Sequence, residues 1–335
     1  MGDGTLWTAL RTLEWAMGLL DWLKPPPPED AELNGVVDRV VARLDPMLRS
    51  VADYRRRLAP AVTSARAYCA AIAAQIPGPI EISRPAFASN PLVHALFASA
   101  DDIERMLARS DCVREHLVGA TPAMGDRCCA LLGMRHREKA GFGAQLAGDL
   151  VHYDTPQTTL YFTDHTLAEP SPGLQQARLR LTDVMFDSLV ESLATHVAAV
   201  REEHQGLHTE QAIETARQRA GHGPEDHMRR LADLEARLRA TGDALQPAQL
   251  IDTLVDCLQH PEPYLRLDPV TVAVDRSGVI VGAGDAAHSA GDILNFVELT
   301  SRDKRRWVVM LAYIERAEAC AAVERFEAAR RHIVI

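Results

Sequence analysis

Aromatic residues are scarce in this 335-residue chain: phenylalanine, tryptophan and tyrosine make up 5% of it, whereas hydrophobic residues make up 47%. The cores are therefore expected to consist mainly of leucine, valine and alanine. Basic residues are also in deficit, with 36 Lys and Arg against 46 Asp and Glu and a formal net charge of -10. Because nucleic-acid binding draws most of its affinity from cations that neutralise phosphates, we expect no nucleic-acid partner.

The chain also lacks long apolar runs and paired cysteines. No run reaches the ~18 residues of a transmembrane helix, and the first residues do not have the pattern of a signal peptide. None of the six cysteines forms a C-x-x-C pair, and the adjacent Cys128 and Cys129 are interpreted as two buried small hydrophobes. These absences predict a cytoplasmic protein with no membrane span and no cofactor.

The spacing of apolar residues predicts an α+β protein, mainly α, with long amphipathic helices. Gly206 is expected to interrupt the long helix that begins near Leu174, and the central meander is expected to have about three strands with a turn at Thr155–Pro156. The predicted segments are an N-terminal amphipathic helix at 1–24, a Pro-rich linker at 25–30, a helical region at 31–125, an antiparallel β meander at 126–170, a long helical hairpin or short coiled coil at 171–260 and a small α+β unit, rich in β-strand, at 261–335.

One glycine-rich stretch has the spacing of a dinucleotide-binding turn. It reads VIVGAGDAAHSAGD from Val279 to Asp292 and contains Gly282-x-Gly284-x-x-Ala287. Such a turn needs a strand that leads directly into a helix within a β-α-β unit. Here Asp275–Gly278 is predicted to be a tight turn between two Val/Ile runs, so the strand before Gly282 is the second arm of a hairpin. We therefore expect no nucleotide site.

The same D-R-S-G turn, lying between short strands and ahead of a closing helix, resembles the PilZ domains that bind cyclic di-GMP. The resemblance implies a small β-barrel. Those domains carry an R-x-x-x-R pair ahead of a D/N-x-S-x-x-G turn, whereas here Glu262 stands four residues before Arg266 and Ile280 occupies the place of the last glycine. The resemblance is therefore carried over to the fold alone, and a ligand-binding sensor remains an alternative function.

Four of the thirteen histidines are close together in the sequence: His204, His208, His222 and His227. His204 and His208 are four residues apart, so a helix would place both imidazoles on one face. With a hinge at Gly206, these residues are interpreted as a solvent-exposed polar segment, and a metal-binding sensor is the alternative. The meander contains five more polar candidates, which strand geometry is expected to keep apart: His136, His152, Asp154, Asp164 and His165.

The N-terminal helix carries the predicted contact with a partner. At 100° per residue its leucines occupy one face, while Trp15 and Trp22 lie nearly opposite. A helix on the surface of its own domain needs only one apolar face, so the tryptophans indicate contact with another protein or a second copy of the chain. With no nucleophile motif in view, we expect a non-catalytic cytosolic interaction, adaptor or regulatory protein that self-associates through its long helices.

The variant Trp15→Ala, Trp22→Ala should lose a partner or dissociate while keeping most of its thermal stability. Burying one large aromatic side chain contributes roughly 1.5 to 3 kcal/mol, so removing two anchors should weaken an association by several powers of ten. Light scattering gives the mass and circular dichroism the helicity. An unfolded variant with unchanged oligomeric mass would assign both tryptophans to the core.

Overall fold

The computed structural model describes residues 28–119, 124–147, 150–219, 224–275, 278–281, 292–301 and 305–333. The chain divides into two compact units. Unit 1 contains the described residues up to Thr63 and those of Val197–Asp256, and unit 2 contains Ser64–His196 and Cys257–Ile335. The protein is thus a mixture of helices and strands, as its sequence predicts, but the predicted meander and the C-terminal strands belong to one sheet. Within the described ranges, no helix has the length and apolar character needed to cross a membrane.

Unit 1 is helical. Asp45 ends its first helix, because its carboxylate accepts a hydrogen bond from Met47 N at 2.8 Å and pairs with Arg201. A second ion pair joins Arg57 to Asp252. A proline, Pro46, stands at the start of the next helix, η1. The helices of this unit, three of which continue across the division into units, are α2 (Pro28–Leu44), η1 (Pro46–Ser50), α3 (Tyr54–Gln75), α8 (Leu174–Arg219), α9 (Pro224–Ala244) and α10 (Pro247–Gln259).

Helix α8 passes through Gly206 without a break, so the predicted interruption is wrong. A glycine inside a helix costs only about 1 kcal/mol relative to alanine, which tertiary packing readily offsets. The neighbouring Leu207 is buried in a small apolar cluster with Leu234 and Leu238 of α9. Arg237 of α9 also pairs with Glu203 at 3.2 Å. These contacts to α9 hold the helix continuous on both sides of the glycine.

Unit 2 is built on one six-stranded sheet in which the strand order is β3-β2-β6-β5-β4. Neighbours on this path are antiparallel, and β1 pairs with β6 in parallel. Pairing of β2 with β6, from Arg127↔Glu315 to Met134↔Val308, joins the central and C-terminal strands. The strands are β1 (Ile80–Glu81), β2 (Arg127–Ala147), β3 (Leu150–Ser171), β4 (Leu265–Val274), β5 (Asp292–Ser301) and β6 (Arg306–Glu315).

The predicted meander is a single long hairpin of two strands. Thr155 and Pro156 do not form its turn: they pair with Gly143 and Phe142 within the strands. The sequence around Asp154 distorts the strand locally without reversing the chain. Asp154 has a positive φ of 67° and lies at a shift in the β2–β3 register. Aspartate tolerates that conformation and favours bulges as well as chain reversals. The D-T-P-Q sequence therefore bends the strand instead of ending it.

Residues 278–281 close the sheet into a ring. Thr159 of β3 bridges to Val279, and Val274 of β4 bridges to Ile280. Leu160 N donates to the Gly278 carbonyl at 2.9 Å. β3 and β4 are the first and last strands of the sheet path, and this short segment pairs with both of them. The path of strands is therefore closed. This ring, called the barrel below, requires the long hairpin as well as the C-terminal strands.

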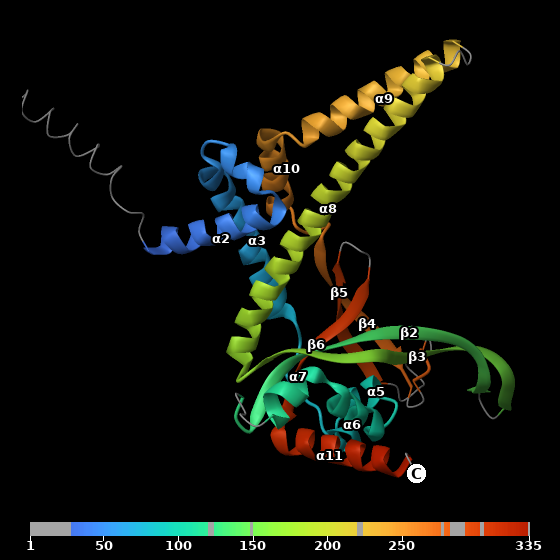
Figure 1. The fold of residues 1–335 in the computed structure, drawn as a ribbon. Helices are drawn as coiled ribbons and strands as arrows, with labels where there is room; N and C mark the ends of the chain where they lie inside the picture. Colours follow the sequence, from blue (N-terminus) through green and yellow to red (C-terminus); the bar gives the residue numbers. More distant parts are fainter. Residues whose placement is uncertain are drawn as a thin grey trace, which may run out of the picture. The chain divides into compact units, whose positions relative to one another are not determined.

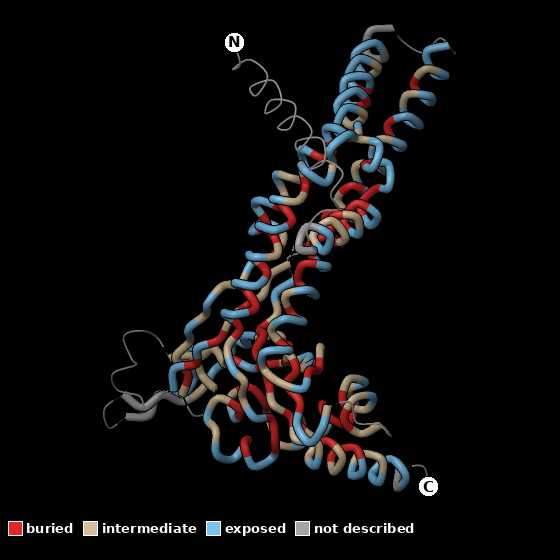
Figure 2. Tube along the Cα trace, turned by 90° about the vertical axis from the view of Figure 1, so that its left-hand side faces the viewer, coloured by how far each residue is buried: buried red, intermediate tan, exposed pale blue. Residues whose placement is uncertain are grey.

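The core of unit 2 lies between this ring and a layer of short helices (Figure 1). Alternate residues of the strands point into it, including Met134, Phe162, Phe296 and Met310. Figure 2 shows the buried residues as red segments along these strands and helices, with exposed residues on their outer sides. The covering helices are α4 (Arg84–Ser89), α5 (Pro91–Leu96), α6 (Ala100–Arg109), α7 (Asp111–Val113), η2 (Arg114–Val118) and α11 (Arg316–Ile333).

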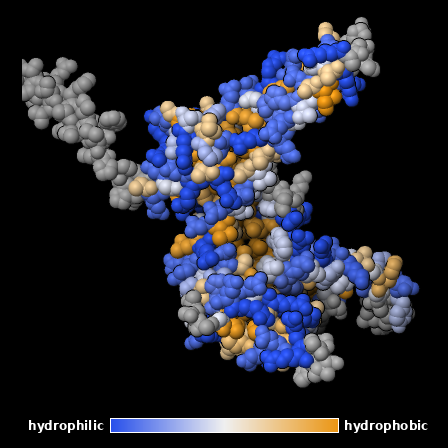
Figure 3. All heavy atoms as spheres, viewed as in Figure 1, coloured by the Kyte–Doolittle hydropathy of each residue, from blue (hydrophilic) through white to orange (hydrophobic). Residues whose placement is uncertain are grey.

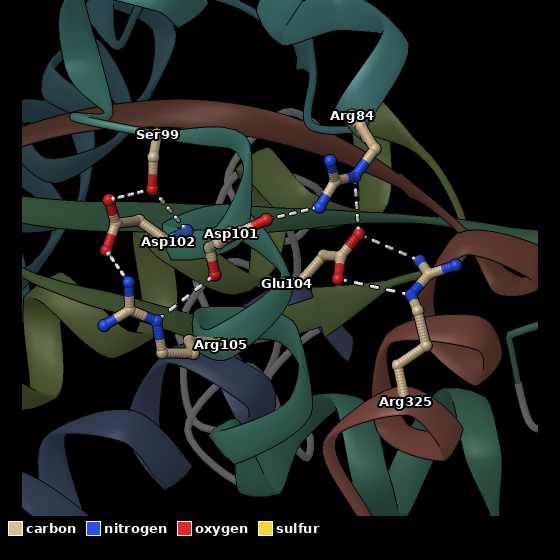
Figure 4. Close-up of polar contacts among 7 residues, drawn as sticks. All are labelled: Arg84, Ser99, Asp101, Asp102, Glu104, Arg105 and Arg325. Atoms are coloured by element: carbon tan, nitrogen blue, oxygen red, sulfur yellow. Dashed lines mark hydrogen bonds and ion pairs between the residues drawn. The ribbon is translucent and has the colours of Figure 1, made fainter. Parts of the chain in front are cut away.

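Ion pairs connect α6 to its neighbours. Glu104 forms ion pairs with Arg84 at 2.7 Å and with Arg325 at 3.0 Å, so one carboxylate joins α4, α6 and α11 (Figure 4). Ser99 caps the start of α6: its hydroxyl accepts a hydrogen bond from Asp102 N at 3.2 Å. These contacts hold the short helices, which have few internal hydrogen bonds, in one arrangement over the barrel.

A polar group interrupts the core of the ring. His136, Glu298 and Arg306 continue the inward-facing rows of β2, β5 and β6. His136 Nδ1 lies 2.5 Å from Glu298 Oε1, and the Arg306 guanidinium lies 3.9 Å from the second carboxylate oxygen. The Glu298 side chain is only 7% exposed. A buried carboxylate in an apolar core requires such partners, so the pair should be important for stability.

Replacing His136 by alanine should lower the free energy of unfolding by about 3 kcal/mol, because Glu298 keeps its burial and loses its nearest partner. Denaturant unfolding followed at 222 nm measures the change. His136→Phe with Glu298→Leu should be close to neutral, since neither polar group remains. Arg56→Ala, which removes an exposed ion pair with Asp53, is the matched control and should change stability by less than about 1 kcal/mol. A neutral His136→Ala would contradict this role.

Candidate functional site

A cavity of unit 2 lies at the closing segment of the ring. It has a volume of about 760 Å³, within the range of about 300 to 1,000 Å³ typical of small-molecule sites. One wall is the segment 87–98, which contains α5 and the ends of its neighbours. The opposite wall is the part of β3 from Thr159 to Thr163, and Asp275, Gly278 and Asp292 lie at the edge.

Aromatic side chains contribute to both walls. Phe87 packs against His94 with ring centroids 4.7 Å apart, and Phe97 stacks on His165 at 4.5 Å with the planes 19° apart. Tyr161 is 42% exposed and lines the β3 wall. In a chain with few aromatic residues, this concentration at one cavity is notable. Such walls suit a flat ring, because aromatic pairs attract by about 0.5 to 1.5 kcal/mol beyond the area they bury.

His165 behind this wall acts as an apolar ring. Its Nε2 donates to the Leu96 carbonyl at 2.8 Å. Burial lowers the pKa of His165, while this hydrogen bond opposes the shift. The ring that supports Phe97 is therefore neutral at pH 7. The opposite wall is supported in a similar way, because Phe162 packs edge-on against Phe296 at 5.6 Å, and Phe296 in turn contacts His136.

The polar groups at the edge of the cavity are acidic or neutral. Asp275 Oδ1 accepts from Val279 N at 3.0 Å and so shapes the turn, while Asp292 is exposed at the start of β5. Asn90 caps α5 through its side-chain oxygen. No lysine or arginine is among the described residues that line the cavity.

The turn beside the cavity is the hairpin that the sequence predicts. Asp275 N bonds the Val279 carbonyl at 2.9 Å, and Val281 N bonds Ala273 at 2.9 Å. Gly278 has a φ of +77°, and a side chain there would meet the Leu160 carbonyl at 3.2 Å. The strand ahead of Gly282 is thus a hairpin arm, as expected. Residues 282–291, which include the rest of the glycine motif, lie outside the described residues.

The structure describes the side chains of two of the four clustered histidines. His204 and His208 lie together on α8, with their Nε2 atoms 3.2 Å apart. Residue 227 is in the first turn of α9, seven residues and so roughly 10 Å before Leu234, the α9 residue that packs on Leu207. His222 lies outside the described residues. Among those described, no three His, Cys, Asp or Glu side chains gather to hold a metal.

The remaining candidate residues are the polar residues of the predicted meander and the two N-terminal tryptophans. His136 and His165 serve different parts of the barrel core, as given above, and Asp154 and Asp164 are at separate bulges. The structure says nothing of the side chain of His152. Trp15 and Trp22, the predicted partner contact, lie outside the described residues, so their role stays a prediction.

Sequence reasoning missed the cavity itself. One wall of the cavity is the short helix α5, which begins with the cap Asn90 and a proline. This sequence pattern predicts the start of a helix but does not indicate a ligand site. Tyr161 stands in an alternating run that predicts only a strand. Comparison of the chain with models of protein families, with curated proteins and with solved structures gives no match. The cavity is therefore judged on its own geometry.

Four of the cysteines should resist alkylation in the native protein. Burial raises the pKa of Cys69 and Cys112 to about 11 and that of Cys128 to about 12, and it also raises the pKa of Cys129. The thiolate is the reactive form, so very little is present at pH 8. Mass spectrometry after iodoacetamide treatment should show these four unlabelled, and all six cysteines labelled in denaturant. Rapid native labelling of Cys128 would contradict its burial.

Proposed function

We propose that the protein is a non-catalytic regulatory protein whose barrel binds a small planar molecule in the cavity beside Asp275. The observation that carries this proposal is the cavity of about 760 Å³ with aromatic side chains on both walls. Aromatic walls with a few polar groups at the edge are the usual composition of a small-molecule site. A cytoplasmic location remains a prediction from the cysteine pattern.

The ligand class follows from the side chains. Phe87 and Tyr161 line the two walls, and the edge carries the carboxylates of Asp275 and Asp292. A flat heteroaromatic ring that carries an amine satisfies both features, because the ring stacks and the cation meets a carboxylate. The ligand is therefore a planar aromatic amine or a neutral analogue.

A second role is supported by α8 and α9. A groove of about 620 Å³ lies along these helices, and both carboxylates and guanidiniums line it, among them Glu210, Asp233 and Arg229. Ile213 in this groove is 48% exposed. Figure 3 shows hydrophobic atoms on the otherwise hydrophilic surface of this pair of helices. Mixed charges beside an apolar strip are self-complementary, so we propose that a second copy of the chain associates here.

Tryptamine and indole-3-propionate test the ligand proposal, because they share a ring and carry opposite charges. Saturation-transfer NMR should detect tryptamine bound to the full chain and much weaker binding of the acid. Tyr161→Ala should weaken tryptamine binding roughly five-fold, corresponding to about 1 kcal/mol of ring contact. Asp292→Lys should reverse the preference for charge.

Tyr153→Ala is the matched control. Tyr153 lies on the same strand, is 77% exposed and is absent from the cavity lining. Its removal should leave binding unchanged, and circular dichroism checks that each variant keeps its fold. Equal binding of both indoles, or equal losses in the two tyrosine variants, would reject the cavity as the site.

A further inference from the structure

Two imidazoles of α8 lie against each other in unit 1. His204 and His208 are one helical turn apart, with their Nε2 atoms at 3.2 Å and their rings edge to face at 4.6 Å between centroids. Thr241 of α9 lies on the other side of His204, with its Oγ1 at 2.8 Å from Nδ1. His204 is partly buried by this contact, while His208 is exposed. The pair is therefore open to solvent on one side only.

The hydrogen bonds of Thr241 decide which nitrogen of His204 is free. A hydroxyl has one proton, and that of Thr241 is donated to the Arg237 carbonyl at 2.9 Å, with the Leu238 carbonyl at 3.3 Å. The hydroxyl oxygen can then only accept from His204, so Nδ1 of the imidazole carries the proton. A neutral imidazole protonated at Nδ1 has its lone pair on Nε2. This lone pair belongs to the nitrogen nearest to His208.

The separation of the two nitrogens matches a shared metal ion. Two imidazole nitrogens bound at about 2.0 to 2.1 Å, with an angle of roughly 90° to 109° at the metal, would be about 2.9 to 3.4 Å apart. The observed 3.2 Å lies within this range. Histidines that bind metals usually donate their second ring N–H to an oxygen, which fixes the ring. Thr241 supplies that oxygen for His204.

We propose that His204 and His208 form a two-nitrogen site for a divalent transition-metal ion. Imidazole nitrogen favours Cu(II), Ni(II) and Zn(II), whereas Mg(II) and Ca(II) prefer oxygen. On binding, the ion takes the place of the His208 proton between the two Nε2 atoms; this proton passes to solvent while His208 takes up a proton at Nδ1, so both imidazoles remain neutral. Water fills the remaining positions. Glu203, the nearest carboxylate in the sequence, pairs with Arg237 of α9 and supplies no ligand.

The site depends on the contact between α8 and α9. Gly242 lies beside His204, where an added Cβ would be 3.4 Å from ring carbon Cε1. Thr241 and Gly242 therefore hold the ring from α9, while the helical spacing of α8 presents His208. Because the two nitrogens meet only when α8 is helical, the ion should stabilise this part of the protein. The site is in unit 1 and is independent of the barrel cavity.

Copper binding tests this proposal with the full-length protein stripped of metal by a chelator. CuCl2 is titrated in glycine buffer, which removes loosely held copper, and is followed by calorimetry and electron paramagnetic resonance at pH 7.5. The wild type should bind one equivalent with a spectrum from two imidazole nitrogens. His208→Ala should lose this signal, while His196→Ala, which removes another imidazole from α8, should keep it. CaCl2 should give no heat.

Thr241 distinguishes a built site from an accidental pair of histidines. Thr241→Val removes the oxygen that orients His204 and should weaken copper binding by about tenfold, whereas Thr241→Ser should retain the wild-type affinity. Circular dichroism of α-helix content verifies that each variant folds, and the exposed position of His208 makes its replacement mild. Wild-type stoichiometry and affinity in His208→Ala, or equal affinities in the two Thr241 variants, would overturn the proposal.

Discussion

The structure of unit 2 depends on the antiparallel pairing of β2 with β6. This ladder joins Arg127 to Glu315 and Met134 to Val308, residues that are far apart in the chain. It unites the long hairpin with the C-terminal strands, and the bridges at Val279 and Ile280 then close the ring. Without this ladder the hairpin would be an isolated pair of strands, which is marginally stable in water. The core under the short helices would also lose one of its sides.

Closure of the ring also creates the candidate cavity. The closing residues bring the Asp275 turn to the β3 segment that carries Tyr161, and α5 covers the space between them. The aromatic walls are supported from behind by His165 and, through Phe296, by His136. The buried His136–Glu298 pair thus serves the same core that shapes the cavity wall. Stability and ligand binding are expected to be coupled through Phe296.

The helical unit follows a different principle. Leu207 of α8 packs in an apolar cluster with Leu234 and Leu238 of α9. Polar contacts complete the association, including Glu203–Arg237 and the hydrogen bond between His204 and Thr241. Polar contacts of this kind have strict geometry, which is why they can orient an imidazole. The same contact that keeps α8 continuous through Gly206 therefore prepares the proposed metal site.

The sequence alone determined much of the local structure. The helix boundaries near Pro46, the start of α6 at Ser99 and the Asp275–Gly278 turn follow from capping and backbone preferences, which act over a few residues. Apolar spacing likewise predicted the mixed α and β content.

Tertiary structure decided the rest. Whether Asp154 begins a turn or a bulge depends on whether β2 continues beside it, and whether Gly206 ends a helix depends on the packing of Leu207 against α9. The cavity needs strands and helices that meet only after folding. The His204 site needs Thr241, which is 37 residues away in the chain. Such contacts arise from the burial of distant segments against one another, and local patterns carry no record of which segments meet.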